Sequence, residues 1–232
     1  MRGGSLIPKE LKDFLTASYV ENAPEQIDGY TLDKKMSNLF GKVYVNQDLK
    51  KVVVAFRGTG EASDWANNGI WGISGTAYKL TSRFKTAKQM NDAAKRKYKG
   101  YQFELIGHSQ AGILVNELCS KADKNCISLN PAYKDANLKD NEYIIRSSGD
   151  VVSALSAPKK SMTQFLYPNW TKSHLITIPA KTKDILVEHS PNILDRLDQK
   201  KKIGRGGSKA ACKCENKRQL GEYTLNVCLS TL

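Results

Sequence analysis

Residues 105–112 read Leu-Ile-Gly-His-Ser-Gln-Ala-Gly, and this stretch says more about the fold than any other. An apolar run ends in Gly-x-Ser and a helical pattern follows, so we predict a strand over 101–106, a helix over 111–122 and a sharp turn between them. Small residues flank Ser109 because so tight a turn leaves no room for larger side chains. Such a turn exposes the serine hydroxyl at the carboxyl end of a sheet.

Short apolar runs and helical patterns alternate on both sides of this turn. The other expected strands are 42–46, 51–56, 126–129, 143–146 and 175–178, and the other expected helices are 8–19, 80–98 and 191–197. The first two runs flank a short turn, which predicts an antiparallel hairpin. The later strands are separated by helices, which predicts a mostly parallel sheet with helices on both faces and an α/β fold.

The chain has 232 residues and 40% hydrophobic content, which fits one globular domain and excludes disorder throughout. The pattern ends near residue 198, so we expect a domain over 1–198 and a basic, Gly- and Lys-rich tail over 199–232. No window approaches the roughly 18 apolar residues of a membrane span, and no secretory apolar region precedes Lys9. These features predict a cytoplasmic or otherwise intracellular protein.

The net charge of +13 is concentrated in two segments. Residues 79–99 hold eight basic residues and one acid, and residues 196–218 hold nine basic and two acidic residues. Basic patches favour anionic partners, although a charge run is also typical of a solvated helix face or a tail. Neither segment interleaves aromatic residues at base-stacking spacing, so nucleic acid is not expected as a partner. An anionic membrane is kept as the alternative partner of these basic segments.

The cysteine pattern does not indicate a secreted, disulfide-rich scaffold. The odd set comprises Cys119, Cys126, Cys212, Cys214 and Cys228. Cys212-x-Cys214 has the spacing of half a metal site, but no histidine lies near it and no second close pair exists. We therefore expect free thiols in a reducing compartment, and no metal.

A nucleophilic serine needs a base, and the base needs a third group to orient it. His189 is expected in a loop off the carboxyl side of the sheet, so it is the candidate base. His108 would point away from the serine and His174 opens a strand, so both are expected to be structural. Asp150 follows a strand that lies between the serine and His189 in the chain, and it is the candidate acid.

Four other aspartates follow less convincing strands, namely Asp123, Asp135, Asp140 and Asp184. Of these, Asp184 is the best substitute for Asp150. Acyl transfer also needs donors for the developing oxyanion. We expect the backbone N–H of Gln110 as one donor, and Thr59, in the loop after strand 51–56, as the second.

Five motifs together resemble the class 3, fungal-type lipases of the α/β-hydrolase superfamily. They are Ala55-Phe-Arg-Gly-Thr59, Asp64-Trp-Ala-Asn67, Gly107-His-Ser-Gln-Ala-Gly112, Gly149-Asp-Val and His189-Ser-Pro. The resemblance spans about residues 10 to 198. It implies an oxyanion donor at Thr59, the catalytic residues Ser109, Asp150 and His189, and hydrolysis of carboxylic esters of lipids without a metal or cofactor.

Two departures bear on the expected substrate. The family's Gly-His-Ser-Leu-Gly-Gly has become Gly-His-Ser-Gln-Ala-Gly, which makes the turn bulkier at Ala111. The family's lid would fall in residues 64–78, where Trp65, Ile70, Trp71 and Ile73 form an apolar face, and a loop packed on the core is the alternative. A short lid and a small core favour esterase or phospholipase substrates over bulky triglycerides.

Two functions follow from these observations. The first is an active lipase, phospholipase or esterase with Ser109 as nucleophile. The second is a catalytically inactive hydrolase fold that binds polyanions through its basic helix and tail.

Overall fold

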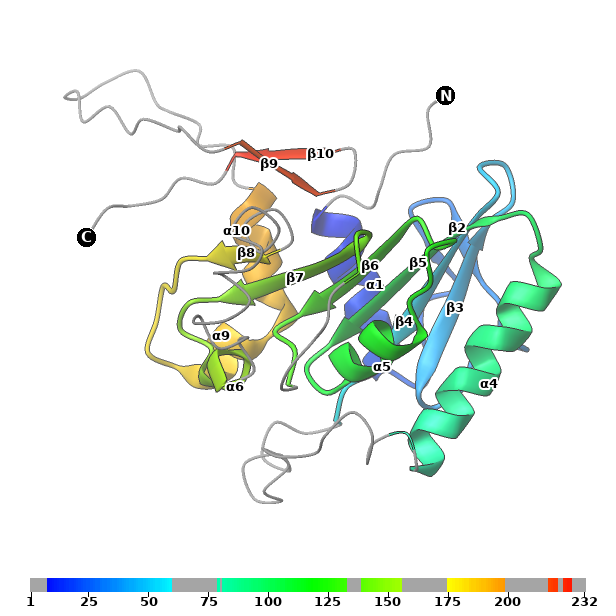
Figure 1. Cartoon of the computed structure of the whole chain (residues 1–232), viewed down its shortest axis with the longest axis horizontal. Helices are drawn as coiled ribbons and strands as arrows, with labels where there is room; N and C mark the ends of the chain where they lie inside the picture. The colour runs from blue at the N-terminus through cyan, green and yellow to red at the C-terminus, as the bar shows by residue number, and fades with distance from the viewer. Residues whose placement is uncertain are drawn as a thin grey trace.

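An eight-stranded sheet forms the centre of the computed structural model, and its strands follow one another in chain order (Figure 1). The structure describes residues 8–59, 79, 81–132, 139–155, 175–198, 217–220 and 223–226. The sheet contains β1 (Gln26–Ile27), β2 (Tyr30–Leu32), β3 (Gly41–Asn46), β4 (Lys51–Phe56), β5 (Gln102–His108), β6 (Asn125–Leu129), β7 (Glu142–Ser147) and β8 (Leu175–Ile178).

The pairing of the strands changes from antiparallel to parallel at β4. Strands β1 to β4 pair antiparallel, with Val43 opposite Val54 in the β3–β4 hairpin. Strands β4 to β8 all pair parallel, so the carboxyl ends of five strands meet at one edge. The hairpin and the mostly parallel sheet are confirmed. Strands β1 and β2, only two and three residues long, were not predicted.

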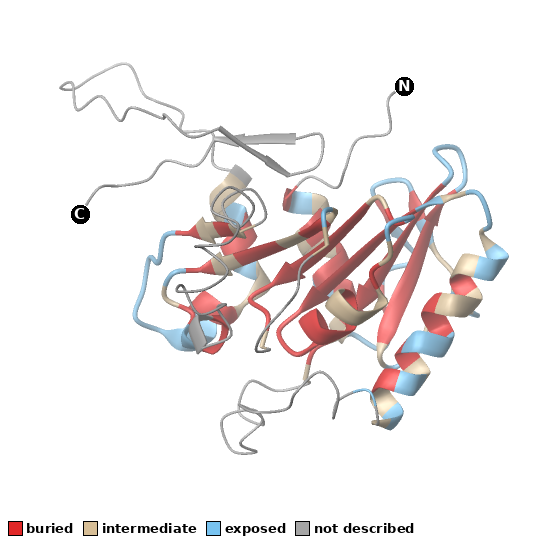
Figure 2. Cartoon of the chain, in the orientation of Figure 1, coloured by how far each residue is buried: buried red, intermediate tan, exposed pale blue. Residues whose placement is uncertain are grey.

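Helices cover both faces of the sheet (Figures 1 and 2), so the predicted α/β class is confirmed. On one face, α1 packs its Phe14 and Leu15 with Ile193 of a 3₁₀ helix. On the other face, α4 and α5 bury side chains such as Phe84 and Leu114. The helical segments are α1 (Pro8–Tyr19), α4 (Ser82–Lys97), α5 (Ala111–Leu118), α6 (Val151–Leu155), α9 (Ile185–His189), η2 (Pro191–Leu194) and α10 (Asp195–Asp198). No helix in the described ranges is long and apolar enough to cross a membrane.

Two elements differ from the sequence prediction in ways that affect the site. His189, expected in a loop, is the last residue of α9, a short helix that Asp184 caps through its side chain. Helix α5 ends at Leu118 rather than near 122, because Cys119 leaves the helical conformation with ψ of 135°. A separate two-stranded sheet is formed by β9 (Lys217–Leu220) and β10 (Tyr223–Asn226).

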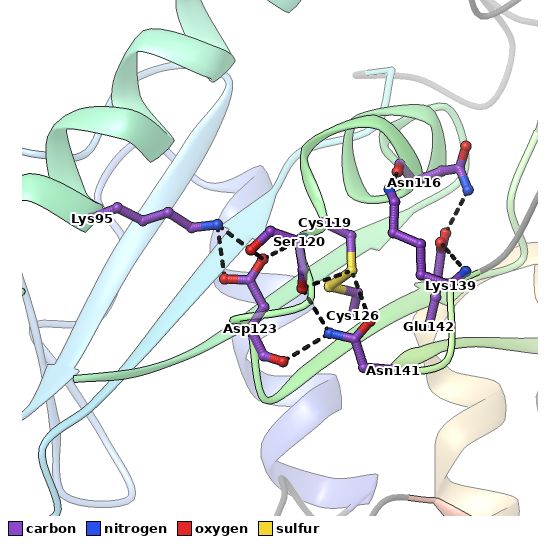
Figure 3. The surroundings of a disulfide bond; sticks show 9 residues. All are labelled: Lys95, Asn116, Cys119, Ser120, Asp123, Cys126, Lys139, Asn141 and Glu142. Atoms are coloured by element: carbon purple, nitrogen blue, oxygen red, sulfur yellow. Dashed lines mark hydrogen bonds and ion pairs between the residues drawn. A yellow bond between two sulfur atoms is a disulfide. The ribbon is translucent and has the colours of Figure 1, made fainter. Parts of the chain in front are cut away.

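Cys119 and Cys126 form a disulfide across the short connection from α5 to β6 (Figure 3). The prediction of free thiols was therefore wrong for this pair. The end of the helix and the start of the strand lie side by side, with the two Cα atoms 6.0 Å apart, a separation that suits a disulfide. Disulfides persist mainly in oxidising compartments, so this bond does not support the expected reducing environment.

The same corner contains the one group of potential metal ligands among the described residues, Cys119, Asp123 and Cys126. Both sulfur atoms are used in the disulfide. The Asp123 carboxylate pairs with Lys95 of α4 at 2.7 Å and accepts a bond from the Ser120 hydroxyl (Figure 3). The group is thus a structural cluster that ties α4 to the α5–β6 connection.

Several sequence predictions fall outside the described residues. These are the proposed lid over 64–78 with Trp65, Ile70, Trp71 and Ile73, and also Asp135, His174, Cys212, Cys214 and Cys228.

Candidate active site

Ser109 lies in the sharp turn between β5 and α5, at the carboxyl edge of the sheet. Its backbone has a φ of +57°, a left-handed conformation that is unfavourable for a non-glycine residue and is maintained by its surroundings. Gly107 is needed beside it, because a Cβ there would lie 2.7 Å from the carbonyl oxygen of Ala111. The backbone is therefore held in the conformation expected of a nucleophile turn.

The loop after β4 lies directly against this turn. A Cβ on Gly58 would meet the Tyr19 hydroxyl and would lie 3.3 Å from the Cβ of Ser109, so only glycine permits so close an approach. Arg83 of α4 donates from its guanidinium to the carbonyl oxygens of Arg57 and Gly58. The loop is thus fixed from both sides, with Thr59 at the same pocket as Ser109.

Asp150 and His189 are joined by a hydrogen bond, with 3.0 Å between Oδ1 and Nδ1. Asp150 is fully buried, and its carboxylate also accepts the backbone N–H groups of Val152 and Ser153 at the start of α6. These bonds fix the orientation of the carboxylate, which in turn orients the imidazole of His189. Two residues that lie 39 positions apart in the chain therefore act as one unit.

His108 connects the backbone of His189, the serine turn and, through Tyr19, the loop after β4. Its Nε2 lies 2.6 Å from the carbonyl oxygen of His189, which can only accept, so Nε2 carries the proton. Its Nδ1 then accepts from the Tyr19 hydroxyl at 2.6 Å, while that hydroxyl accepts the N–H of Gly58. Burial lowers the pKa of His108 to about 3 and nearby His189 adds to the shift, so the ring is neutral near pH 7. Burial raises the pKa of Tyr19 to about 12.

Asn130 fixes the backbone of α9 from the end of β6. Its amide nitrogen donates to the carbonyl oxygens of Glu188 and His189, each at 2.9 Å, and its amide oxygen accepts the N–H of Ser147. Asn130 is fully buried and has a φ of +43°. The carbonyl of His189 therefore receives two side-chain hydrogen bonds, one from Asn130 and one from His108.

Glu188, the neighbour of His189, is the centre of a buried ion pair. Its carboxylate accepts two bonds from the Arg196 guanidinium, one from the Ser147 hydroxyl, and the backbone N–H groups of Lys181 and Thr182. The bonds from Arg196 are the main reason that the pKa of Glu188 falls to about 2. This network holds the loop before α9 in place.

These elements surround one pocket of about 350 Å³. It is lined by Thr16, Tyr19, Val20, Thr59, His108, Ser109, Leu186, His189, Ser190, Pro191 and Asn192. Ser109, His189 and Thr59 come from three separate segments and meet here. Among its lining residues Ser109 and His189 are buried, whereas the apolar Val20 and Leu186 are exposed.

Residues 9–149 match the model of a phospholipase-like family, described as the Tle-like phospholipase domain. The match includes the Ser109 turn and the Thr59 loop, and it covers more than half of the chain. The chain belongs to this family. Membership of this phospholipase-like family supports lipid ester hydrolysis. The matched range ends one residue before Asp150, so Asp150 and His189 lie beyond it.

Solved structures of fungal lipases are also similar to parts of this chain. Lip2 lipase from Yarrowia lipolytica is 14% identical, with 63% of this chain and 73% of that chain covered and a TM-score of 0.43. A Rhizomucor miehei lipase propeptide complex is 13% identical, with 82% and 76% covered and a TM-score of 0.47. A triacylglycerol lipase from Penicillium expansum is 18% identical, with 66% and 75% covered and a TM-score of 0.42. No curated protein sequence matches the chain.

The remaining predicted residues of the Tle-like domain have clear positions. Gln110 is buried at the N-cap of α5, next to the serine. Asp184, the substitute acid, caps α9 by accepting the N–H groups of Leu186 and Val187, and so has a structural position. Asp123 lies at the disulfide corner with Lys95.

Three residues of the Tle-like site were missed by the sequence analysis, namely Tyr19, Asn130 and Glu188. Tyr19 is the last residue of α1, and its hydroxyl points to His108. Asn130 directly follows a strand. Asp150 was chosen because it follows a strand, and the same criterion would have identified Asn130. Glu188 precedes the candidate base, but nothing in the sequence pairs it with Arg196.

Proposed function

We propose that this Tle-like domain is a serine hydrolase that cleaves carboxylic ester bonds of phospholipids through an acyl-enzyme. The observation that carries the proposal is the meeting of a left-handed Ser109 and an Asp150-bound His189 in one pocket. Neither feature alone indicates catalysis, since buried histidine–carboxylate pairs also occur in structural cores. Their convergence on a pocket is the arrangement that nucleophilic catalysis requires.

In the proposed reaction, the hydroxyl oxygen of Ser109 attacks the ester carbonyl and His189 takes the hydroxyl proton. Because Nδ1 is engaged by Asp150, Nε2 is the ring nitrogen that takes it. His189 then gives the proton to the leaving alcohol, and the acyl group stays on Ser109. Water then attacks the acyl carbon while His189 takes a proton from it. The bond to the serine oxygen breaks, His189 gives that proton to the oxygen, and the fatty acid leaves with Ser109 restored.

The negative charge on the carbonyl oxygen needs hydrogen-bond donors in place before the reaction. We assign the backbone N–H of Gln110 and the Thr59 loop to this role, as the sequence predicts. The fixation of that loop by Arg83 and Tyr19 supports the assignment, because preorganised donors stabilise the oxyanion far better than mobile ones. Each such donor contributes about 3 kcal/mol to lowering the barrier.

The alternative, a polyanion-binding module, receives less support from the basic helix. Four of its lysines are in ion pairs, so much of their charge is locally balanced. The pairs are Lys79–Glu117, Lys88–Asp92, Lys95–Asp123 and Lys97–Asp33. We therefore retain the hydrolase proposal, assign it to a domain over residues 1–198, and treat 199–232 as a separate tail.

The test is a substrate panel with the full chain and its Ser109→Ala variant. We expect release of fatty acid from phospholipid, and of alcohol from a water-soluble short ester, by the parent protein only. Triacylglycerol tested beside phospholipid defines the substrate class. Equal rates for the parent and Ser109→Ala on every ester would contradict the proposal, and salt-sensitive binding of a polyanion by both proteins would then favour the alternative.

A further inference from the structure

Three consecutive apolar side chains are exposed on α9, the short helix that carries the proposed base. Ile185, Leu186 and Val187 are 40%, 57% and 44% exposed, whereas the next two residues, Glu188 and His189, are buried. The helix is thus attached to the protein through its last two residues. Its outward side presents aliphatic groups to solvent, at the end of the pale blue segment on the left of Figure 2.

This apolar tip is continuous with the mouth of the pocket. Leu186 lines the pocket, and so does Val20 at the end of α1, which is 44% exposed. Val151, also 44% exposed, directly follows the Asp150 that bonds to His189, so it belongs to the same edge of the sheet. Exposed apolar side chains gathered around a pocket mark an interaction site more often than scattered ones do.

The charge beside the tip favours an anionic partner. Lys181 and Lys183 are exposed just before α9. Of the two acids in residues 181–189, Glu188 is buried against Arg196, and the exposed Asp184 accepts two backbone N–H groups at the start of α9. Aliphatic side chains next to lysines are the combination that binds an anionic bilayer, because each part contributes separately to membrane affinity.

We propose that α9, with its tip Ile185–Val187 and the adjacent Lys181 and Lys183, docks the domain on an anionic phospholipid bilayer. The tip enters the headgroup region and places the mouth of the pocket against the lipid. The inference rests on the proposed function, since it explains how an ester held in a membrane reaches Ser109. It assigns the membrane contact to α9 rather than to the ion-paired α4.

The binding test uses full-length protein with Ser109→Ala, so that the vesicles are not hydrolysed. The probes are vesicles of phosphatidylglycerol and phosphatidylcholine, and vesicles of phosphatidylcholine alone, measured by co-sedimentation. Ile185→Gln/Val187→Gln replaces two side chains of the tip that do not line the pocket. Leu49→Gln is the matched control, since Leu49 is also 40% exposed but lies in the β3–β4 turn, at the opposite edge of the sheet.

We expect the parent to bind the anionic vesicles, and the double variant to bind them at least about tenfold more weakly. Leu49→Gln should bind like the parent. Lys181→Glu/Lys183→Glu should weaken binding to anionic vesicles and leave binding to neutral ones unchanged. The proposal is overturned if the parent does not bind, if the double variant binds like the parent, or if Leu49→Gln loses as much.

Hydrolysis of a water-soluble ester separates this proposal from the proposed function. With Ser109 present, Ile185→Gln/Val187→Gln should keep the parent rate on that ester and lose rate on anionic vesicles. Loss of vesicle binding with intact soluble-ester hydrolysis supports the docking role. If the parent hydrolyses no ester but its binding still depends on α9, the proposed function fails while the docking surface stands.

Discussion

Polar side chains are buried at both edges of the parallel sheet, but only those at the carboxyl edge meet at a pocket. At the amino edge, Lys95 and the Ser120 hydroxyl both donate to the Asp123 carboxylate beside the Cys119–Cys126 disulfide (Figure 3). At the carboxyl edge, the bonds of the buried polar groups converge on His189, which lines an open pocket. Burial and hydrogen bonding alone therefore do not mark a site. Convergence on a pocket distinguishes the two edges.

The largest expected effect is on kcat, which should fall for a substitution at the carboxyl edge and not for one at the amino edge. Asp150→Asn removes the carboxylate that orients His189, so kcat on a soluble ester should fall by about 10³–10⁴-fold. Asp123→Asn, which changes the buried aspartate of the amino edge, should leave kcat unchanged. A comparable loss in both variants would remove the functional distinction between the edges, and thermal melts establish that both proteins are folded.

The next effect concerns the ion pair behind the base. Glu188→Gln leaves the Arg196 guanidinium without its carboxylate, which should lower the free energy of unfolding by about 3 kcal/mol at pH 7. The pKa of Glu188 is about 2 in the folded protein, below its ordinary 4.5. Its stabilising effect is therefore full above pH 4.5 and is lost as pH falls towards 2.

Urea unfolding across this pH range measures that effect. The difference in free energy between the parent and Glu188→Gln should shrink as pH falls from about 4.5 to about 2. Glu142 is the control, since it is also fully buried but burial raises its pKa, so its ionisation has the opposite effect on stability. A constant difference for Glu188→Gln over this range would show that the ion pair does not stabilise the fold as described.

A smaller effect is expected at the amino edge, on stability alone. Cys119→Ser/Cys126→Ser removes the disulfide, and the short loop that it closes predicts a loss of about 2–3 kcal/mol in the free energy of unfolding. Hydrolysis of a soluble ester should not change. Urea unfolding and initial rates on the same preparation test both statements, and a drop in kcat would mean that the two edges are coupled through α5.

The smallest effect should come from the hydroxyl that joins α1 to His108. Tyr19→Phe removes the bonds to Gly58 and His108, so kcat should fall about tenfold with little change in KM. Tyr44→Phe is a matched control, because it removes another tyrosine hydroxyl bond, to the carbonyl of Pro24. Both variants should lose similar stability. If kcat falls equally in both, Tyr19 has only a structural role.

Much of the fold could be predicted from local patterns. The β3–β4 hairpin, α1, α4 and the strand–turn–helix at Ser109 all depend on apolar periodicity and small residues within short stretches. Strands β1 and β2 carry too few residues for a pattern, and their formation depends on pairing with β3. The extent of α5 was overestimated because the chain leaves the helix at Cys119, and the sequence does not show that this residue meets Cys126.

The candidate site was predictable where a residue adjoins a strand end. Ser109 and Asp150 occupy such positions, and parallel strands bring their carboxyl ends to one edge. Asn130 also adjoins a strand end, but Tyr19 and Arg196 were not predictable in this way. Tyr19 reaches the site from a helix on the sheet's face, and Arg196 reaches Glu188 from α10, so each depends on tertiary packing.

Labelling of Ser109 by a fluorophosphonate tests the central claim most directly. The reagent forms a stable adduct with an activated serine, and intact mass and peptide mapping identify the residue. The account predicts one adduct, on Ser109, absent from Ser109→Ala and much slower to form in Asp150→Asn. Labelling of the parent no faster than of Ser109→Ala would contradict the account.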